Sequence, residues 1–183
     1  MKDRVLVTYA SRMGGTKGIA EKIAEELQGH SLQVDVIRVD RVKDLSPYQA
    51  LVLGSGVYIG QWRREAAAFL KKNETALAQL PTWLFSSGPT GEGELDSLLQ
   101  GWHFPAGLQA VADRIKPRDM IIFRGVVYEK DLNFIERWMM KNVGAAYGDY
   151  RDWERVTDWA GKIANELKQE KPITAETAAP PKQ

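Results

Sequence analysis

Short apolar runs alternate with amphipathic segments along most of this chain. The run from Val5 to Tyr9 contains no charged residue, which is typical of a strand buried on both faces, as in a parallel sheet. A loop of small residues follows. Apolar side chains then recur at helical spacing at Ile19, Ile23 and Leu27, with Glu and Lys between them. The start of the chain therefore predicts a strand, a loop and a helix.

The same alternation continues toward the carboxyl end. Further strands are predicted at 32–39, 48–58, 82–88 and 119–127, and further helices at 63–72, 108–115 and 151–169. Between the last two strands, residues 89–107 are rich in loop-forming residues. Strands that alternate with helices predict an α/β fold, with an open and mainly parallel sheet, helices on both faces and right-handed crossovers.

The length of 183 residues fits one compact domain with a sizeable core. Residues 171–183, KPITAETAAPPKQ, have no core-forming pattern and are predicted to be disordered. We therefore expect a single domain over residues 1–170. The apolar run at the N-terminus is too short for a secretory signal, and no stretch is long enough to span a membrane, so a cytoplasmic protein is expected.

The amino-acid composition limits the kinds of chemistry that the protein can carry out. The absence of cysteine excludes disulfides, thiolate metal sites, iron–sulfur ligation and thiol catalysis, so redox chemistry would need a bound organic cofactor. The 25 basic and 24 acidic residues give no overall field that would attract nucleic acid. His30 and His103 do not have metal-ligand spacing, so no metal site is predicted. No side chain is assigned as a catalytic acid, base or nucleophile.

In open α/β sheets, ligands bind at the carboxyl ends of the strands, where the strand order reverses. After the first strand, SRMGGT (residues 11–16) leads directly into the helix. Glycines let backbone amides converge, hydroxyls donate hydrogen bonds, and a helix N-terminus favours anions, so this loop can hold a phosphate. The alternative is that Ser11 or Thr16 caps the helix and the glycines form a turn. The spacing fits neither a P-loop nor the dinucleotide motif.

Two further loops follow the third and fourth strands, GSGVYIGQW and SSGPTGEGE. Flexible backbone combined with Tyr58 and Trp62 suits a planar heteroaromatic ring. The alternative is that these two rings pack on the domain or begin the next helix. Arg63 and Arg64 beside this loop could pair with substrate carboxylates, or could form a solvated first turn. Next to a phosphate loop, the aromatic loop favours a mononucleotide with a flat ring.

YASRMGGT resembles the phosphate loop of the flavodoxin family, Ser/Thr-x-Thr-Gly-x-Thr, at Ser11, Gly14 and Thr16. Met13 departs from it, because it replaces a hydroxyl residue and so removes a phosphate contact. The resemblance implies FMN as cofactor and a three-layer sandwich with a five-stranded parallel sheet in the order 2-1-3-4-5. It implies phosphate contacts from Ser11, Arg12, Met13, Gly14, Gly15 and Thr16. It implies isoalloxazine contacts from Ser55, Gly56, Val57, Tyr58, Ile59, Gly60, Trp62, Ser87, Gly88, Pro89, Thr90 and Gly91.

Over residues 4–169 the chain also resembles the flavodoxin-type protoporphyrinogen dehydrogenases that use menaquinone. The stretch FIERWMMKNVGAAYGDYRDWERVTDWAGKIA (134–164) is the more specific signal, because electron-shuttling flavodoxins lack this aromatic, basic helix before their last helix. The resemblance implies an FMN oxidoreductase that passes electrons from a small organic reductant to a quinone-like acceptor. Two alternatives stay open: an electron carrier that docks with redox partner proteins, and a flavin-free scaffold. Balanced charge disfavours the carrier, because shuttle flavodoxins are strongly acidic.

The extra segment at 128–150 contains a predicted helix from Leu132 to Val143. Leu132, Ile135, Met139 and Val143 lie on one side of it, with Phe134 and Trp138 nearby. This face either covers the sheet edge and core, or inserts into the headgroup region of a membrane and receives a quinone. The second alternative implies peripheral contact at the inner face of the membrane.

Overall fold

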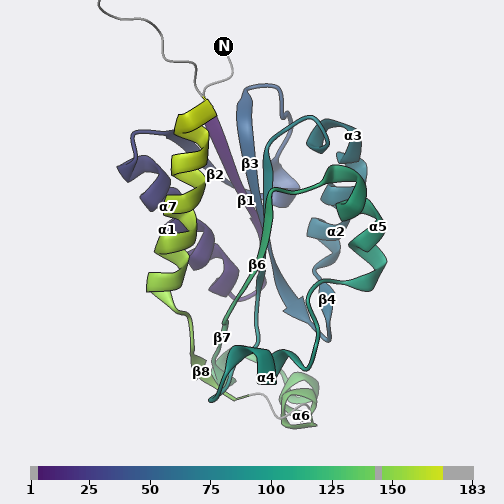
Figure 1. Cartoon of the computed structure of the whole chain (residues 1–183). Coiled ribbons are helices and arrows are strands. Elements are labelled where there is room, and N and C mark those ends of the chain that lie inside the picture. Colours follow the sequence, from purple (N-terminus) through teal and green to yellow (C-terminus); the bar gives the residue numbers. More distant parts are fainter. Residues whose placement is uncertain (1–3, 143–145, 171–183) are drawn as a thin grey trace, which may run out of the picture.

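Five parallel strands form the centre of the molecule, and helices cover both faces (Figure 1). The structure is a computed structural model that describes residues 4–142 and 146–170, so the predicted tail at 171–183 lies outside the described residues. Across the sheet the strands run in the order β2 (Gln33–Arg38), β1 (Arg4–Ala10), β3 (Tyr48–Tyr58), β5 (Thr82–Ser87) and β6 (Asp119–Phe123). Because the short β4 is not one of these five strands, β5 and β6 are the fourth and fifth strands of the parallel sheet, and the order is 2-1-3-4-5. The predicted α/β sandwich and its strand order are confirmed.

Two groups of helices enclose the sheet. Helices α1 (Gly15–Gly29) and α7 (Trp153–Glu170) lie on one face (Figure 1). Helices α2 (Arg64–Lys72), α3 (Glu74–Leu77) and α5 (Ala106–Ile115) lie on the other. The remaining elements are short: η1 (Val39–Arg41), β4 (Gln61–Trp62), α4 (Leu95–Leu99), β7 (Val126–Val127), η2 (Glu129–Asp131), α6 (Phe134–Asn142) and β8 (Gly148–Asp149).

The apolar run of β1 is explained by burial on both faces. Val5 and Val7 pack in the cluster beneath α1 and α7, whereas Leu6 packs in the cluster beneath α2 and α5. All three side chains are fully buried. Burying a side chain of this size stabilises the fold by about 1.5–3 kcal/mol. Residues Ile19, Ile23 and Leu27 of α1 supply the facing surface at helical spacing.

The structure divides the predicted strand at 119–127 into two parts. Strand β6 ends at Phe123, and β7 pairs antiparallel with β8 outside the main sheet. The chain leaves the sheet because β5, the neighbour of β6, ends at Ser87, and Gly125 N–H instead donates to the Pro89 carbonyl at 2.9 Å. The last helix also begins later than predicted, at Trp153, where the Asp152 side chain accepts from Arg155 N–H at 3.0 Å and so caps it.

The strand register brings the ends of β1, β3 and β5 to one edge. Ala10 pairs with Ser55, and Gly56 pairs with Ser87. The chain segments that follow these strands therefore lie side by side, as parallel pairing requires. This edge holds the three loops predicted to bind a cofactor.

Candidate functional site

The loop between β1 and α1 presents backbone amides rather than side-chain caps. Gly14 has a φ of +86°, a conformation that favours glycine, and its N–H donates to the Ser11 hydroxyl at 3.0 Å. The first helical bond is from Gly18 N–H to the Gly14 carbonyl, so the amides of residues 15–17 have no acceptor within the helix. No side chain caps α1 and its first turn contains no acid. The alternative of a side-chain cap is therefore wrong, although Gly14 does form the turn, and the free amides favour an anion.

Thr16 adds a hydroxyl to these amides. The residue is only 4% exposed, and its side chain makes no hydrogen bond to any residue in the described part of the chain. A Cβ on Gly56 would lie 3.1 Å from the Thr16 Oγ1 atom, so the phosphate loop closely contacts the end of β3. Arg12 and Met13 are exposed at the outer side of the loop. A hydroxyl donor beside free amides fits a phosphate group.

The loop after β3 is a tight hairpin. Val57 pairs with Trp62 and Tyr58 pairs with Gln61, which leaves Ile59 and Gly60 as a two-residue turn. Both turn residues have positive φ, +47° and +67°, as a type I′ turn requires. The side chain of Tyr58 is 45% exposed and that of Ile59 is 65% exposed. The hairpin therefore places one aromatic ring at the edge of the sheet.

The ring of Trp62 lies in the core instead. Its Nε1 donates to the Ser86 hydroxyl at 2.9 Å, and its ring packs edge-on against Phe104 with centroids 5.1 Å apart. The Ser55 hydroxyl accepts from Arg63 N–H at 3.0 Å and so holds the end of the hairpin. Trp62 thus packs on the domain, as the alternative for this residue describes, and its contact with a cofactor ring stays a prediction. Tyr58 is the aromatic residue of this loop that stays accessible.

The loop after β5 is held by the chain that follows β6. Gly88 N–H donates to the Phe123 carbonyl at 3.0 Å, next to the Gly125–Pro89 bond. Thr90 and Gly91 are buried in this loop. The guanidinium of Arg124 donates to the carbonyl oxygens of Gly91, at 2.9 Å, and of Gly93. The third predicted loop is therefore ordered by a residue that the sequence had not indicated.

The arginines beside the hairpin differ in their surroundings. The Arg63 guanidinium binds the Glu65 carboxylate at 3.0 Å. Burial raises the pKa of Glu65, but hydrogen bonds from its own backbone N–H and from Arg63 outweigh burial and hold the pKa below its usual value. Arg63 is therefore already paired. Arg64 is exposed in the first turn of α2, which agrees with the alternative that this arginine belongs to a solvated first helical turn.

Helix α6 exposes its apolar side chains. Phe134 is 85% exposed, Ile135 is 65% and Trp138 is 62%, while Leu132, just before the helix, is buried. These three exposed residues do not cover the core, so that alternative is wrong for them. Val143 and the side chain of Met139 lie outside what the structure describes.

Three residues near the site were missed by the sequence interpretation. Trp102 Nε1 donates to the Gly60 carbonyl at 3.0 Å and fixes the hairpin turn. Arg124 binds the third loop, and Arg151 lies beside the first turn of α1. Each acts across a long sequence separation, and none belongs to a local motif. Their only signal was the presence of large side chains in loops that precede or follow predicted elements.

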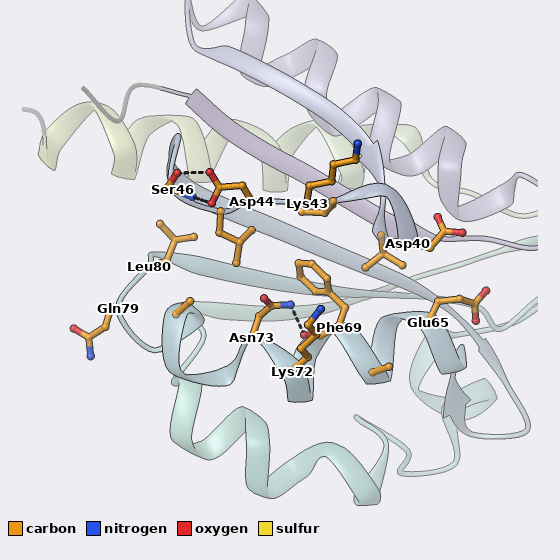
Figure 2. A pocket seen from close by; sticks show the side chains of 15 residues that line it. Asp40, Lys43, Asp44, Ser46, Glu65, Phe69, Lys72, Asn73, Gln79 and Leu80 are labelled. Atoms are coloured by element: carbon orange, nitrogen blue, oxygen red, sulfur yellow. Dashed lines mark hydrogen bonds between the residues drawn. The ribbon is translucent and has the colours of Figure 1, made fainter.

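A groove of about 830 Å³ lies away from these loops (Figure 2). It runs between residues 39–46 and helices α2 and α3, over the apolar side chains of Val39, Phe69 and Leu80. None of the predicted cofactor residues lines it. Within the described residues, no group of three or more His, Asp or Glu side chains could hold a metal ion.

Comparison with known proteins agrees with this arrangement. The family model described as "Flavodoxin domain" matches residues 6–153. The chain belongs to the flavodoxin family. It is 24% identical to protoporphyrinogen IX dehydrogenase (quinone) of Escherichia coli K12 over 173 residues, which cover 88% of this chain and 95% of that protein.

Solved structures show the same fold. A flavodoxin from the domain Archaea has a TM-score of 0.56 at 19% identity, over 90% of this chain and 99% of that one. The flavodiiron core of Flv1 from Synechocystis sp. PCC6803 has a TM-score of 0.62 at 15% identity, over 92% of this chain and 36% of that one. Among the described helices, none combines the length and the apolar character needed to cross a bilayer.

Proposed function

We propose that this chain is an FMN-dependent oxidoreductase that moves electrons between a small organic reductant and a quinone-like acceptor. The observation that carries the proposal is the start of α1, where free amides and the Thr16 hydroxyl lie together at a helix N-terminus that has no side-chain cap and no acidic residue. Backbone amides and hydroxyls at a helix N-terminus are donors that bind a phosphate. The loops that suit a flat ring lie at the same edge of the sheet.

Each loop has a separate task in this proposal. The amides of Gly15 and Thr16, with the Thr16 hydroxyl, would hold the phosphate. Tyr58 would stack on the isoalloxazine ring, and the backbone of residues 87–91 would hydrogen-bond its edge. FMN supplies the electron-transfer chemistry when it is bound, while the chain positions the ring and limits its contact with water. No side chain has to act as a general acid or base.

Two observations favour an enzyme over a carrier. The likeness to the quinone-linked dehydrogenase extends over 88% of this chain, including the segment with α6. The balance of 25 basic and 24 acidic residues lacks the acidic field that steers a carrier to basic partners. A porphyrinogen-like reductant belongs to the same proposal, because Arg64 is exposed beside the hairpin and can meet carboxylates.

Helix α6 supplies a route to a quinone dissolved in lipid. Phe134, Ile135 and Trp138 are exposed on it, and Lys141 is exposed near its end. Aromatic and cationic residues together favour the headgroup region of an anionic membrane. A helix of nine residues gives only weak attachment by itself. We therefore place the protein at the inner face of the membrane as a peripheral, reversible contact.

The first test is an absorbance spectrum of the purified protein before and after addition of FMN, followed by reduction with dithionite and reoxidation with a menaquinone analogue. Flavin bands, tighter binding of FMN than of riboflavin and rapid reoxidation by the quinone are expected. Absence of FMN binding would overturn the proposal. Binding of FMN with reoxidation only by one-electron protein acceptors would instead support the electron carrier.

A further inference from the structure

Arg124 fixes the loop that follows β5 by two backbone contacts. Its Nη1 donates to the Gly91 carbonyl at 2.9 Å, and its Nη2 donates to the Gly93 carbonyl. The Gly125 amide that follows Arg124 binds Pro89 at 2.9 Å. A planar guanidinium with both ends bound has little freedom to move. Its charge is therefore held at a fixed place within the third loop of the site.

No carboxylate in the described part of the chain forms an ion pair with Arg124. Two other arginines near the site bind carboxylates, Arg63 that of Glu65 and Arg151 that of Asp149. Glu92 and Glu94 lie in the same loop but are exposed to solvent. Arg124 itself is half-buried. Because partial burial weakens solvent screening, its charge acts more strongly at short range than a surface arginine would.

We propose that Arg124 is the positive charge that stabilises the two-electron-reduced form of the flavin and so suits this site to two-electron partners such as quinones. This inference rests on the proposed function. Full reduction of FMN at neutral pH adds two electrons and one proton, so that the ring gains one negative charge. The acceptor, a quinone, then takes these two electrons, the proton on the reduced ring and one proton from water, and becomes a quinol, while FMN returns to its oxidised form. A fixed cation beside the ring lowers the free energy of the charged form.

The charge and the position of Arg124 can be separated by two variants. Arg124→Gln removes the charge, whereas Arg124→Lys keeps it and loses the paired contacts with the two carbonyls. FMN-loaded protein is titrated with dithionite against reference dyes to obtain the two-electron midpoint potential. We expect R124Q to bind reduced FMN about tenfold more weakly relative to oxidised FMN, which equals a fall of about 30 mV. R124K should retain most of the wild-type potential.

Arg114→Gln is the matched control, because it removes an arginine that pairs with Glu74 on the surface of α3 and α5. Its potential should equal that of the wild type. Equal shifts in R124Q and R124K would show that loop position matters instead of charge, and would overturn the inference. An unchanged potential in R124Q would overturn it too. If R124Q fails to fold, Arg124→Met repeats the loss of charge.

Failure of the proposed function gives a different result. In that case the wild-type protein shows no flavin bands with added FMN, and the inference about Arg124 falls with it. When the wild type binds FMN and R124Q keeps its potential, only the inference about Arg124 fails. The salt dependence of the potential gives a second measurement, because added salt should narrow the difference between wild type and R124Q.

Discussion

The Arg151 guanidinium lies against the first turn of α1, with Nη1 3.5 Å from the carbonyl oxygen of Gly15. The same guanidinium binds Asp149 through Nε at 2.8 Å and Nη2 at 2.5 Å, and it stacks 4.5 Å above the Trp153 ring. A Cβ at Gly18 would lie 2.6 Å from Nη1, so a side chain there would displace the guanidinium from this position. The segment before α7 thereby supports the helix turn that would hold the phosphate.

Replacing Arg151 by Met should weaken FMN binding more than riboflavin binding. The variant keeps a long apolar stem but loses the contacts that hold the first turn of α1 in place. We expect a loss of about 1 kcal/mol, or five- to tenfold in the dissociation constant of FMN. Fluorescence titration with both flavins measures it. Arg155→Met, an exposed arginine on α7, is the control. An equal loss for riboflavin would show that Arg151 supports the fold and not the phosphate loop.

The Asp149–Arg151 pair also predicts a dependence on pH. Hydrogen bonds from Arg151 lower the pKa of Asp149, although burial opposes them. The folded pKa therefore lies below the unfolded value of about 3.9, so the pair stabilises the fold above that pH. This contribution is lost as the pH falls through the folded pKa. The difference in unfolding free energy between wild type and Asp149→Asn should thus be largest near neutrality.

Urea unfolding of both proteins at several pH values between 7 and about 3 measures that difference. Asp131→Asn, an exposed carboxylate in η2, is the control for general acid effects. A difference that stays constant down to the lowest pH would show that the charge of Asp149 does not contribute.

Ile59 occupies the turn of the hairpin in a strained conformation. Its φ of +47° is unfavourable for a β-branched residue, whereas asparagine tolerates this region. Ile59→Asn should therefore raise the free energy of unfolding by about 1 kcal/mol. Strain at an exposed apolar residue beside the ring site is typical of a functional position, so FMN binding or quinone turnover should weaken at the same time.

Ile135→Asn is a matched control, because Ile135 is equally exposed, at 65%, but lies in helix α6. Its substitution should give no gain in stability to urea. If Ile59→Asn leaves both stability and flavin properties unchanged, the turn is neither strained nor functional.

Thr16→Val removes the hydroxyl that lies beside the free amides of the phosphate loop and keeps the shape of the side chain. The expected loss is about 1–3 kcal/mol in FMN binding, because a hydrogen bond to a charged group is lost. Riboflavin, which lacks the phosphate, should bind unchanged. Thr157→Val on α7 is the control, since its hydroxyl bonds only the Trp153 carbonyl. Unaltered FMN affinity in Thr16→Val would remove Thr16 from the site.

The strands, helices and connecting loops could be predicted because each of them has a local sequence pattern. Apolar runs and helical spacing predict the strands and helices, the resemblance to flavodoxins implies their order, and parallel pairing in that order places the three loops at one edge. The hairpin after β3 could not be predicted, since Ile59-Gly60 is not a usual two-residue turn sequence. No local pattern therefore distinguishes the exposed ring of Tyr58 from the buried ring of Trp62.

The contacts of Arg124 and Arg151 could not be predicted from the sequence, for a different reason. Each guanidinium binds backbone carbonyls, and carbonyls are present at every residue, so no residue type marks the partner. Arg151 and Gly15 are 136 positions apart, and Arg124 lies 33 positions from Gly91. Only the three-dimensional path of the chain after β6 brings these residues to the loops.

The apolar face of α6 gives the last prediction. Ile135→Glu and Trp138→Glu each place a carboxylate among side chains that are now exposed and apolar. Because that carboxylate opposes both insertion and attraction to anionic lipid, either variant should release the protein from vesicles of anionic phospholipid that contain menaquinone. Co-sedimentation measures binding, and circular dichroism verifies the fold.

Met120→Glu tests whether any added charge would have the same effect. Met120 is 43% exposed on β6, near the amino ends of the strands and therefore at the opposite edge of the sheet from α6. This variant should sediment with vesicles as the wild type does. Release by all three variants would indicate a general charge effect, because distant and local carboxylates would then act alike. Folded α6 variants that stay bound would rule out this face as the membrane contact, and quinone would have to reach the flavin edge from solution.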